Sequence, residues 1–390
     1  MFREEAGRLT AALVRVLGDF ELAEEIVQDA LVVAMERWPQ DGIPKSPGAW
    51  LLTVARHRAL DQVRRGMRLQ AKLRQLELPV TQEPDDRLRL IFTCCHPALS
   101  PESQVALTLR AICGLTVAEI ARAFLTSEAA IAKRLVRARR KIVDARIPYR
   151  VPPADELEER LKEVLSVLYL MFNEGYLTSD GDAPARRDIA DDAAWLAALV
   201  VKLLPGEPEP LGLLALMRLH LARAESRFDE AGDLVPLEDQ DRTRWDRAKI
   251  AAAVALLDEA APCRRPGPYQ IQAAIVACHA QAPSWAATDW LQIVALYDML
   301  LRMTRSPVVC LNRAVALRHL TSVEFALGEV EGLAPDLDEY ALFHAVRADL
   351  LQASGQPELA RPALERALSL TGNSAERRLL QRRLSAHVVA

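Results

Sequence analysis

Cys94, Cys95 and His96 stand next to one another, and no other group in this sequence comes nearer to a catalytic or metal-binding cluster. A zinc site needs about four ligands at spaced positions, and no CxxC or HxxxH pattern lies nearby to complete one. A cysteine and a histidine that are adjacent in the chain also rarely face each other as nucleophile and base. We therefore expect these residues to pack at the end of a helix, with a regulatory role left open.

The rest of the sequence offers no Ser, His and Asp constellation, no paired-carboxylate site and no glycine-rich phosphate loop. We expect a protein that is not an enzyme and that has no cofactor or metal. Six cysteines scattered over 390 residues do not form a disulfide framework. The first residues lack a secretory pattern, and no apolar run approaches the roughly 18 residues that a membrane span needs. A cytoplasmic protein is expected.

The chemistry that the sequence does favour is binding, and it is concentrated in a basic stretch near residue 140. Ile131, Leu135, Ala138 and Ile142 recur at helical spacing, which predicts one buried stripe. The outer faces of this helix carry six cationic side chains: Lys133, Arg134, Arg137, Arg139, Arg140 and Lys141. Cations at this density can bind DNA phosphates. A helix hairpin with a solvated basic face is the alternative.

Two shorter helices are predicted just before the basic helix. Pro101 occupies a favourable first-turn position in the first of them, and Gly114 ends it. Thr116 and Glu119 have the spacing of a capping box, in which a hydroxyl and a carboxylate each satisfy a backbone N–H at a helix start. A short helix, a turn and a long basic helix together describe a helix-turn-helix, whose last helix enters a DNA major groove.

The run GLTVAEIARAF…TSEAAIAKRLVRARRKI resembles the fourth region of bacterial sigma factors of the sigma-70 family, extracytoplasmic-function type. In that family this helix-turn-helix reads the −35 promoter element. The chain departs from the usual pattern at residues 124–126, where a glycine is common. The resemblance implies base contacts from Ser127, Glu128, Lys133 and Arg134. It implies phosphate contacts from Arg137, Arg139 and Arg140.

The first 66 residues also read as helices. Leu9, Leu13 and Leu17 mark one amphipathic helix, and Asp19 can cap the next, whose apolar side runs from Ala23 to Met35. Its other side is polar and acidic. In the family, this second-region helix docks on the clamp coiled coil of RNA polymerase; a solvated helix in a bundle is the alternative. The resemblance implies polymerase contacts from Glu24, Glu25, Gln28 and Asp29.

A loop rich in proline and glycine at residues 39–48 precedes a third helix, WLLTVARHRALDQVRR. This helix resembles the one with which the family reads and melts the −10 element, and the loop ahead of it would receive a flipped base. The residues implied for this role are Trp50, Arg56, His57, Asp61, Arg64 and Arg65. His57 stands where an asparagine is common, and we favour a core anchor over a stacking platform for Trp50.

The net charge of −4 conceals an asymmetry between the two parts of the chain. Residues 1–150 carry 24 Lys and Arg against 18 Asp and Glu, whereas the remainder carries 25 against 35. This split predicts a first part that faces nucleic acid and an acidic second part that could mask it. Residues 69–98, in which Pro79 and Pro84 flank a polar run, are expected to link a second-region domain at 1–68 to a fourth-region domain at 99–147.

A different, entirely helical domain is expected over residues 148–390, after a proline-marked joint at 148–153. Its first helix leads into YLMFNEGY, where the polar residues and glycine should end it. That run resembles the signature of extracytoplasmic-function sigma factors that carry a long helical C-terminal extension. In that group the extension takes the place of a separate anti-sigma protein. The signature residues are Tyr169, Phe172, Asn173, Glu174, Gly175 and Tyr176.

Residues 311–317 are echoed by residues 342–348, an offset of 31 residues. Together with small residues where helices would cross, this predicts tetratricopeptide-like (TPR-like) repeats in about residues 290–375; an irregular bundle is the alternative. Such stacks form concave protein-binding surfaces.

The sequence as a whole predicts an all-α sigma factor that binds core polymerase and promoter DNA. Its extension would pack on the sigma domains, regulate them and receive an unknown protein or small-molecule signal. A helix-turn-helix regulator with a helical sensor domain and no polymerase contact is the alternative function.

Overall fold

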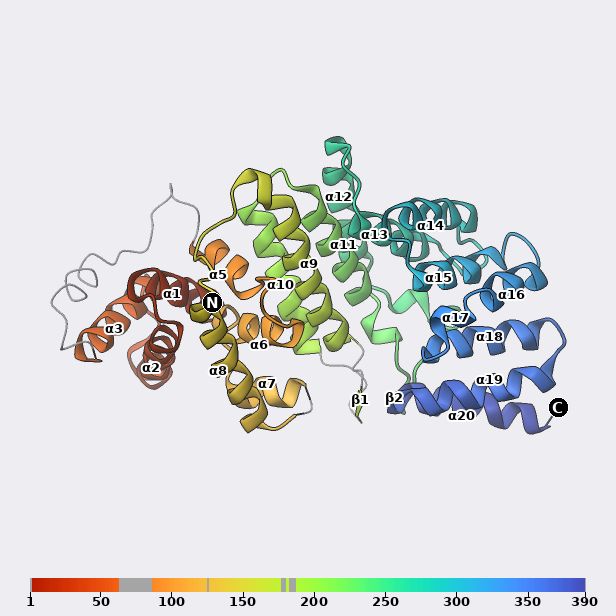
Figure 1. Ribbon diagram of the computed structural model, residues 1–390, viewed down its shortest axis with the longest axis horizontal. Helices are drawn as coiled ribbons and strands as arrows, with labels where there is room; N and C mark the ends of the chain where they lie inside the picture. Colours follow the sequence, from red (N-terminus) through yellow and green to blue (C-terminus); the bar gives the residue numbers. More distant parts are fainter. Residues whose placement is uncertain (1, 63–85, 125, 177–179, 182–186, 390) are drawn as a thin grey trace. The chain divides into compact units, whose positions relative to one another are not determined.

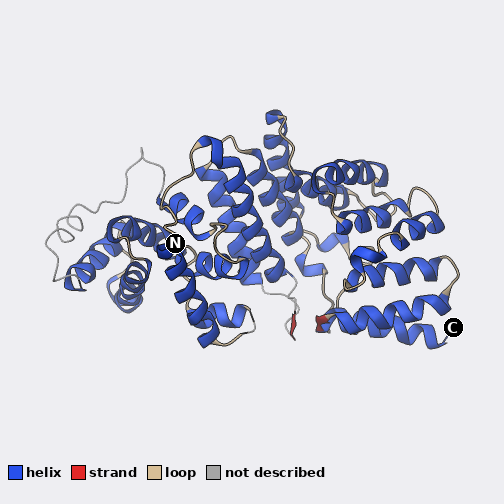
Figure 2. Ribbon diagram, in the orientation of Figure 1, coloured by secondary structure: helices blue, strands red, loops and turns tan. Residues whose placement is uncertain are grey.

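The computed structural model describes residues 2–62, 86–124, 126–176, 180–181 and 187–389. Most of these residues are helical (Figure 2) and very few lie in strands, so the all-α prediction is confirmed. The strands found among them are β1 (Asp180–Gly181) and β2 (Gly372–Asn373), which pair in parallel. Within this described part, no helix combines the length and apolarity that crossing a bilayer requires. The chain divides into two compact units, Met1–Met171 and Phe172–Ala390 (Figure 1).

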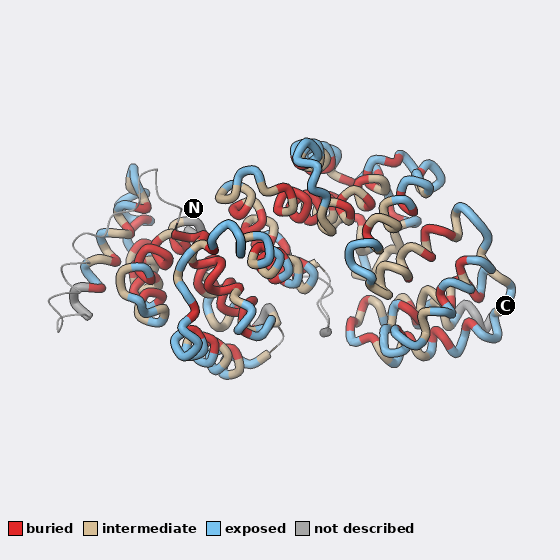
Figure 3. Tube along the Cα trace, turned by 45° about the horizontal axis from the view of Figure 1, so that its top comes forward, coloured by how far each residue is buried: buried red, intermediate tan, exposed pale blue. Residues whose placement is uncertain are grey.

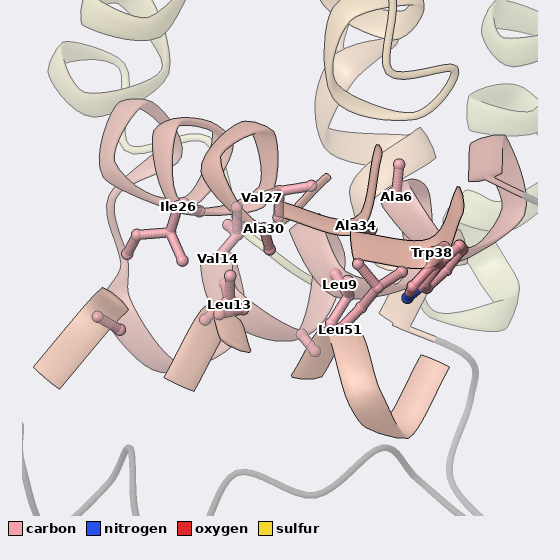
Figure 4. Packing of buried hydrophobic residues seen from close by; sticks show 14 residues of the cluster. Ala6, Leu9, Leu13, Val14, Ile26, Val27, Ala30, Ala34, Trp38 and Leu51 are labelled. Atoms are coloured by element: carbon pink, nitrogen blue, oxygen red, sulfur yellow. The ribbon is translucent and has the colours of Figure 1, made fainter. Parts of the chain in front are cut away.

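The first unit begins with three helices, α1 (Phe2–Leu17), α2 (Phe20–Asp41) and α3 (Pro47–Gln62), that share one apolar core (Figure 4). Asp19 caps α2 as predicted, because its Oδ1 accepts hydrogen bonds from the N–H groups of Glu21 and Leu22 at 2.9 and 3.1 Å. Leu9 and Ile26 are fully buried in this core. Each such side chain contributes about 1.5–3 kcal/mol of stability through burial.

Two helix bounds differ from the prediction. Helix α2 continues through Pro39 to Asp41, so the loop starts at Gly42, not at residue 39. Trp38 is buried and packs edge-to-face on Trp50 at 5.6 Å between ring centroids, which anchors this last turn in the core. Helix α3 begins at Pro47 instead of Trp50, since proline is well suited to a first turn.

Four further helices of the first unit are α5 (Asp86–Cys94), α6 (Pro101–Ala111), α7 (Val117–Ala123) and α8 (Glu128–Asp144). The predicted capping box is confirmed: the Thr116 N–H donates to Glu119 Oε2 at 2.7 Å, and the Glu119 N–H donates to Thr116 Oγ1 at 3.1 Å. Helix α6 ends at Ala111, three residues earlier than predicted, and Gly114 follows in the left-handed conformation with φ +73°. The predicted inner stripe of α8 is buried throughout.

Cys94 and Cys95 lie fully buried where α5 ends. Cys95 Sγ is 3.6 Å from Thr108 Oγ1, and burial raises the pKa of the Cys95 thiol to about 12, which disfavours the reactive thiolate. His96 Nδ1 accepts a hydrogen bond from the Ala98 N–H at 3.1 Å. Among the described residues, no group of three or more Cys, His, Asp or Glu side chains could hold a metal ion. These contacts agree with the expected packing role.

Helix α9 (Ala154–Tyr176) begins in the first unit and ends in the second. The helix end predicted at residues 173–175 falls one residue later, because α9 passes through the buried Gly175 and ends at Tyr176. Phe172 and Tyr176, one helical turn apart, stack their rings at 5.4 Å and support this last turn.

In the described part of the second unit, the regular elements are α-helices joined by loops, together with the two short strands and three short 3₁₀ segments. These helices are α10 (Arg187–Leu203), α11 (Pro208–Leu221), α12 (Arg247–Ala260), α13 (Pro268–Gln281), α14 (Trp290–Thr304), α15 (Pro307–Leu317), α16 (Val323–Glu331), α17 (Ala334–Leu337), α18 (Ala341–Ala353), α19 (Pro357–Leu370) and α20 (Ser374–Val389). The two echoed segments fall in α15 and α18. Buried residues, red in Figure 3, recur along these helices.

Small side chains lie where α18 and α19 pack together. Ala348 on α18 and three alanines on α19, at positions 360, 363 and 367, are all buried in one cluster with Leu351 and Leu364. Alanine at a crossing lets two helices approach closely, since little side chain separates the backbones. This is the use of small residues that the sequence predicted.

Candidate nucleic-acid interface

Helix α8 presents a row of cations away from the core. Its buried stripe, which includes Ile131 and Leu135, fixes the rotation of the helix about its own axis. Lys133, Arg137 and Arg140 are exposed and follow one another at spacings of four and three residues, so they share one helix face. Such a face can contact several DNA phosphates at once.

The start of α8 carries the remaining predicted base-reading residues. Ser127 is exposed and caps the helix, because its Oγ accepts a hydrogen bond from the Ala130 N–H at 3.2 Å. Glu128 is exposed in the first turn, and Arg134 is half-buried nearly two turns further on. The structure therefore brings Ser127, Glu128 and Lys133 to the surface of one helix.

Arg140 also lies near an acidic neighbour on its own helix. Its Nε is 3.5 Å from Asp144 Oδ2, and both side chains are largely exposed. Exposed pairs of this kind contribute little to stability, so the pair does not prevent Arg140 from binding a phosphate.

Arg139 is placed differently from the other predicted phosphate-binding residues. It is half-buried, and its Nη2 donates to Glu24 Oε2 at 2.6 Å. Arg110, which the sequence analysis did not single out, donates to the same oxygen from Nε at 3.1 Å. Arg139 is thus bound to another part of the chain, whereas Arg137 and Arg140 are exposed.

Four of the residues predicted to contact the −10 element, Trp50, Arg56, His57 and Asp61, belong to the described helix α3. Trp50 is half-buried against Trp38 and packs on the α1–α3 core, which supports its role as an anchor. Arg56 is half-buried and His57 is exposed. Asp61 belongs to α3. Arg64 and Arg65 lie outside the described residues.

The predicted polymerase-binding face of α2 is only partly exposed. Glu25 is exposed and Asp29 is half-buried, and Gln28 is half-buried with its Nε2 3.5 Å from the Gly114 carbonyl oxygen. Glu24 was expected on the solvated side, but its side chain is only 4% exposed. The physical reason is its double pairing with arginines of α6 and α8.

Val32 and Met35 are apolar, but they lie on the exposed face of α2, which was expected to be polar and acidic. Val32 is 51% exposed, and Met35, which was predicted to lie inside, is 67% exposed. Val32 follows Glu25 and Asp29 at helical spacing, which is the signal that could have identified it.

The signature residues at the end of α9 contribute mainly to packing. Phe172 is buried, and the ring of Tyr176 lies under the Arg227 guanidinium at 3.8 Å from the ring centroid. Arg227 also donates to the Tyr176 carbonyl oxygen at 2.7 Å. The nearby His220 is held neutral, because burial lowers its pKa well below the usual range. Of the others, Asn173 is exposed, and Tyr169 and Glu174 are half-buried.

Comparisons with known proteins agree with this arrangement. Residues 1–69 match the family Sigma-70 region 2, and residues 89–142 match Sigma-70, region 4. Residues 160–261 match a family of unknown function, DUF6596. The chain is also similar to the uncharacterized protein R00370 of Rhizobium meliloti (strain 1021), with 43% identity over 393 residues, which covers 97% of this chain and 93% of the relative. No solved structure gives a significant match.

Regions 2 and 4 occur here in order on one chain, each built on a packed set of helices, and the relative from R. meliloti shares nearly the whole length. The chain belongs to the sigma-70 family of RNA polymerase sigma factors.

Proposed function

We propose that this sigma factor is of the extracytoplasmic-function type and reads the −35 element with α8 and the −10 element with α3. The observation that carries the proposal is the exposed row of Lys133, Arg137 and Arg140, whose direction is set by the buried stripe of α8. The acidic and apolar face of α2 would dock on core polymerase. The protein would act in the cytoplasm, where polymerase and chromosome are found, and without a catalytic step of its own.

Two single replacements on α8 should have different effects. Lys133→Ala should change which −35 sequences are preferred, because Lys133 lies near the helix start, where base edges are read. Arg137→Ala should weaken binding to all promoters alike, because phosphate contacts carry no sequence information. Promoter-library transcription with core polymerase measures both effects. If neither variant changed preference or overall binding, the assignment of α8 would be wrong.

We further propose that the helical extension regulates the sigma regions, with TPR-like repeats in its last part. Three observations support this idea. The first part of α9 belongs to the same compact unit as regions 2 and 4. Arg160 on α9 donates from Nη2 to the Phe92 carbonyl oxygen at 2.8 Å. Thr93 donates from Oγ1 to the Pro148 carbonyl oxygen at 3.2 Å. An unknown protein or small molecule would act on the extension as the signal.

Deletion of residues 177–390, which keeps α9 whole, should change promoter output relative to the full chain. The comparison uses equal amounts of both proteins with the same core polymerase and template. A charge-neutral internal control is available in Gly328→Ala on α16, since a methyl group there meets open space. Equal output from the truncated and full-length chains would show that the extension has no regulatory role.

A further inference from the structure

Three arginines of the second unit lie close to one another, and none of them pairs with a carboxylate within the described part of the chain. Arg223, Arg227 and Arg242 instead donate to carbonyl oxygens or to a ring nitrogen. We propose that these arginines, with the Tyr176 hydroxyl, bind a small oxyanion of the size and charge of phosphate. The use of this ion as the signal for the extension rests on the proposed function, whereas the binding itself does not.

Aromatic rings hold Arg223 and Arg227 at the end of α9. The Arg227 guanidinium lies 3.8 Å from the Tyr176 ring centroid, and its Nη1 donates to the Tyr176 carbonyl oxygen at 2.7 Å. The centroid of the Tyr176 ring is 4.9 Å from that of the His220 ring. His220 Nδ1 in turn accepts a hydrogen bond from Arg223 Nη2 at 3.0 Å. These contacts connect both guanidinium groups to one tyrosine.

Arg242 reaches the same place from a later segment of the chain. The Asp246 N–H donates to the Ala222 carbonyl oxygen at 2.9 Å. This bond brings the segment that carries Arg242 beside Arg223. Arg242 Nη1 donates to the Ala282 carbonyl oxygen at 2.9 Å, and the Arg242 residue is only 8% exposed. A third, nearly buried cation therefore joins the other two.

Three buried polar groups of this cluster have no hydrogen-bond partner among the described residues. They are Arg223 Nε, Arg242 Nη2 and the Tyr176 hydroxyl. Arginines that served only to bind carbonyl oxygens would leave these donors unused, at a cost in stability. A phosphate ion accepts hydrogen bonds on several oxygens at once, and guanidinium groups bind it with charge-assisted hydrogen bonds. The three unused donors therefore favour an oxyanion as their partner.

The electrostatics of the cluster also favour a bound anion. Burial lowers the pKa of Arg242, and the cations Arg247 and Arg223 lower it further. Burial likewise lowers the pKa of His220 well below its usual range, and Arg223 and Arg227 act in the same direction. Cations that destabilise one another at close range are stabilised when an anion binds between them. Phosphate carries about two negative charges and would supply them here.

The carboxylates near the cluster have other partners. Burial lowers the pKa of Arg227 and Glu376 opposes this effect, but Glu376 Oε2 accepts a hydrogen bond from Thr371 Oγ1 at 2.6 Å. Asp246 Oδ1 accepts from the Lys249 N–H at 3.0 Å, and Asp246 Oδ2 lies 3.2 Å from Lys249 Nζ. Within the described structure, neither carboxylate forms an ion pair with the three arginines, so the cluster keeps an uncompensated positive charge.

Two variants of the full-length chain test the site. Tyr176→Phe removes only a hydroxyl that has no hydrogen-bond partner among the described residues, so the fold should be kept. Arg223→Gln removes one positive charge together with the unused Nε donor. The matched control for the charge is Arg302→Gln, which changes an exposed arginine of α14. Should Arg223→Gln fail to fold, Tyr176→Phe by itself decides the matter.

Each protein is titrated with inorganic phosphate in a calorimeter at constant ionic strength. The native chain and Arg302→Gln should bind phosphate with equal affinity. Arg223→Gln should weaken binding at least about tenfold and Tyr176→Phe about threefold to tenfold, because hydrogen bonds to charged groups are strong. If the native chain showed no saturable binding up to about 10 mM phosphate, or if all the variants bound it equally, ordered water would satisfy these donors and the proposal would be overturned.

Adenosine monophosphate is the second probe, because it carries the same group on a larger body. A buried site should bind it at least about tenfold more weakly than inorganic phosphate. If adenosine monophosphate bound more tightly, and Arg223→Gln weakened that binding, the assignment to a free phosphate ion would be overturned.

Binding and transcription together separate this site from the proposed function. If the native chain binds phosphate through Arg223 but directs no transcription, the site stands and the proposed function fails. If it directs transcription but does not bind phosphate, the site alone is rejected. Promoter output that changes with phosphate, and that needs more phosphate in Tyr176→Phe, would identify the ion as the signal. Constant output despite full binding would reject that role.

Discussion

Replacement of both Arg137 and Arg140 by alanine should weaken binding to duplex DNA on the order of a hundredfold at about 0.1 M salt. Both side chains are exposed on the α8 face that carries Lys133. Each lost phosphate contact removes the release of about one counterion, so the slope of log affinity against log salt should fall by about 2. Fluorescence anisotropy titrations of one labelled duplex at several salt concentrations measure both quantities.

A matched control uses Arg302→Ala combined with Arg361→Ala. Both residues are exposed in the second unit, and their removal changes the net charge by the same amount. This double variant should keep the native affinity and the native salt slope. If the two double variants behaved alike, general charge would explain binding, and the specific role of α8 would be refuted.

Leu135→Ala should destabilise the region 4 helices by about 2–5 kcal/mol, because it removes three heavy atoms from a packed site and leaves a cavity. Leu135 is 2% exposed in the centre of the buried stripe. Loss of the Leu135 side chain should also abolish sequence-specific DNA binding. The buried stripe fixes the rotation of α8 about its axis, and this rotation turns Lys133, Arg137 and Arg140 away from the core. Thermal unfolding followed by circular dichroism, together with DNA binding well below the melting temperature, tests both effects.

The neighbouring residue supplies the control for this change. Val136 is 54% exposed, so Val136→Ala should alter stability by no more than about 0.5 kcal/mol. A large destabilisation by Val136→Ala with none by Leu135→Ala would mean that α8 is rotated about its axis relative to the arrangement described above.

Local signals in the sequence were sufficient for much of the fold. Asp19 and the pair Thr116 and Glu119 satisfy backbone N–H groups within three residues, so their roles can be predicted from spacing alone. The stripe of α8 is likewise a local property with helical period. Such features depend on near neighbours in the chain and not on how domains pack.

The features that the sequence analysis missed depend on distant residues. The residues next to Glu24 in the sequence form a polar pattern, which gives no sign that Glu24 is buried. Its partners, Arg110 and Arg139, lie 86 and 115 positions later in the chain. Local turn preferences at Pro39 and Gly175 favoured helix ends, but packing of Trp38 and of the Phe172–Tyr176 pair extends both helices. Tertiary contacts therefore override local propensity at these sites.

Transcription by purified core RNA polymerase on genomic DNA fragments, with and without this chain, is the most direct test of its role as a sigma factor. We predict that the chain binds the core enzyme and that new transcripts begin at a limited set of sites preceded by shared −35 and −10 sequences. Absence of binding to the core enzyme, together with no new defined 5′ ends, would contradict that role.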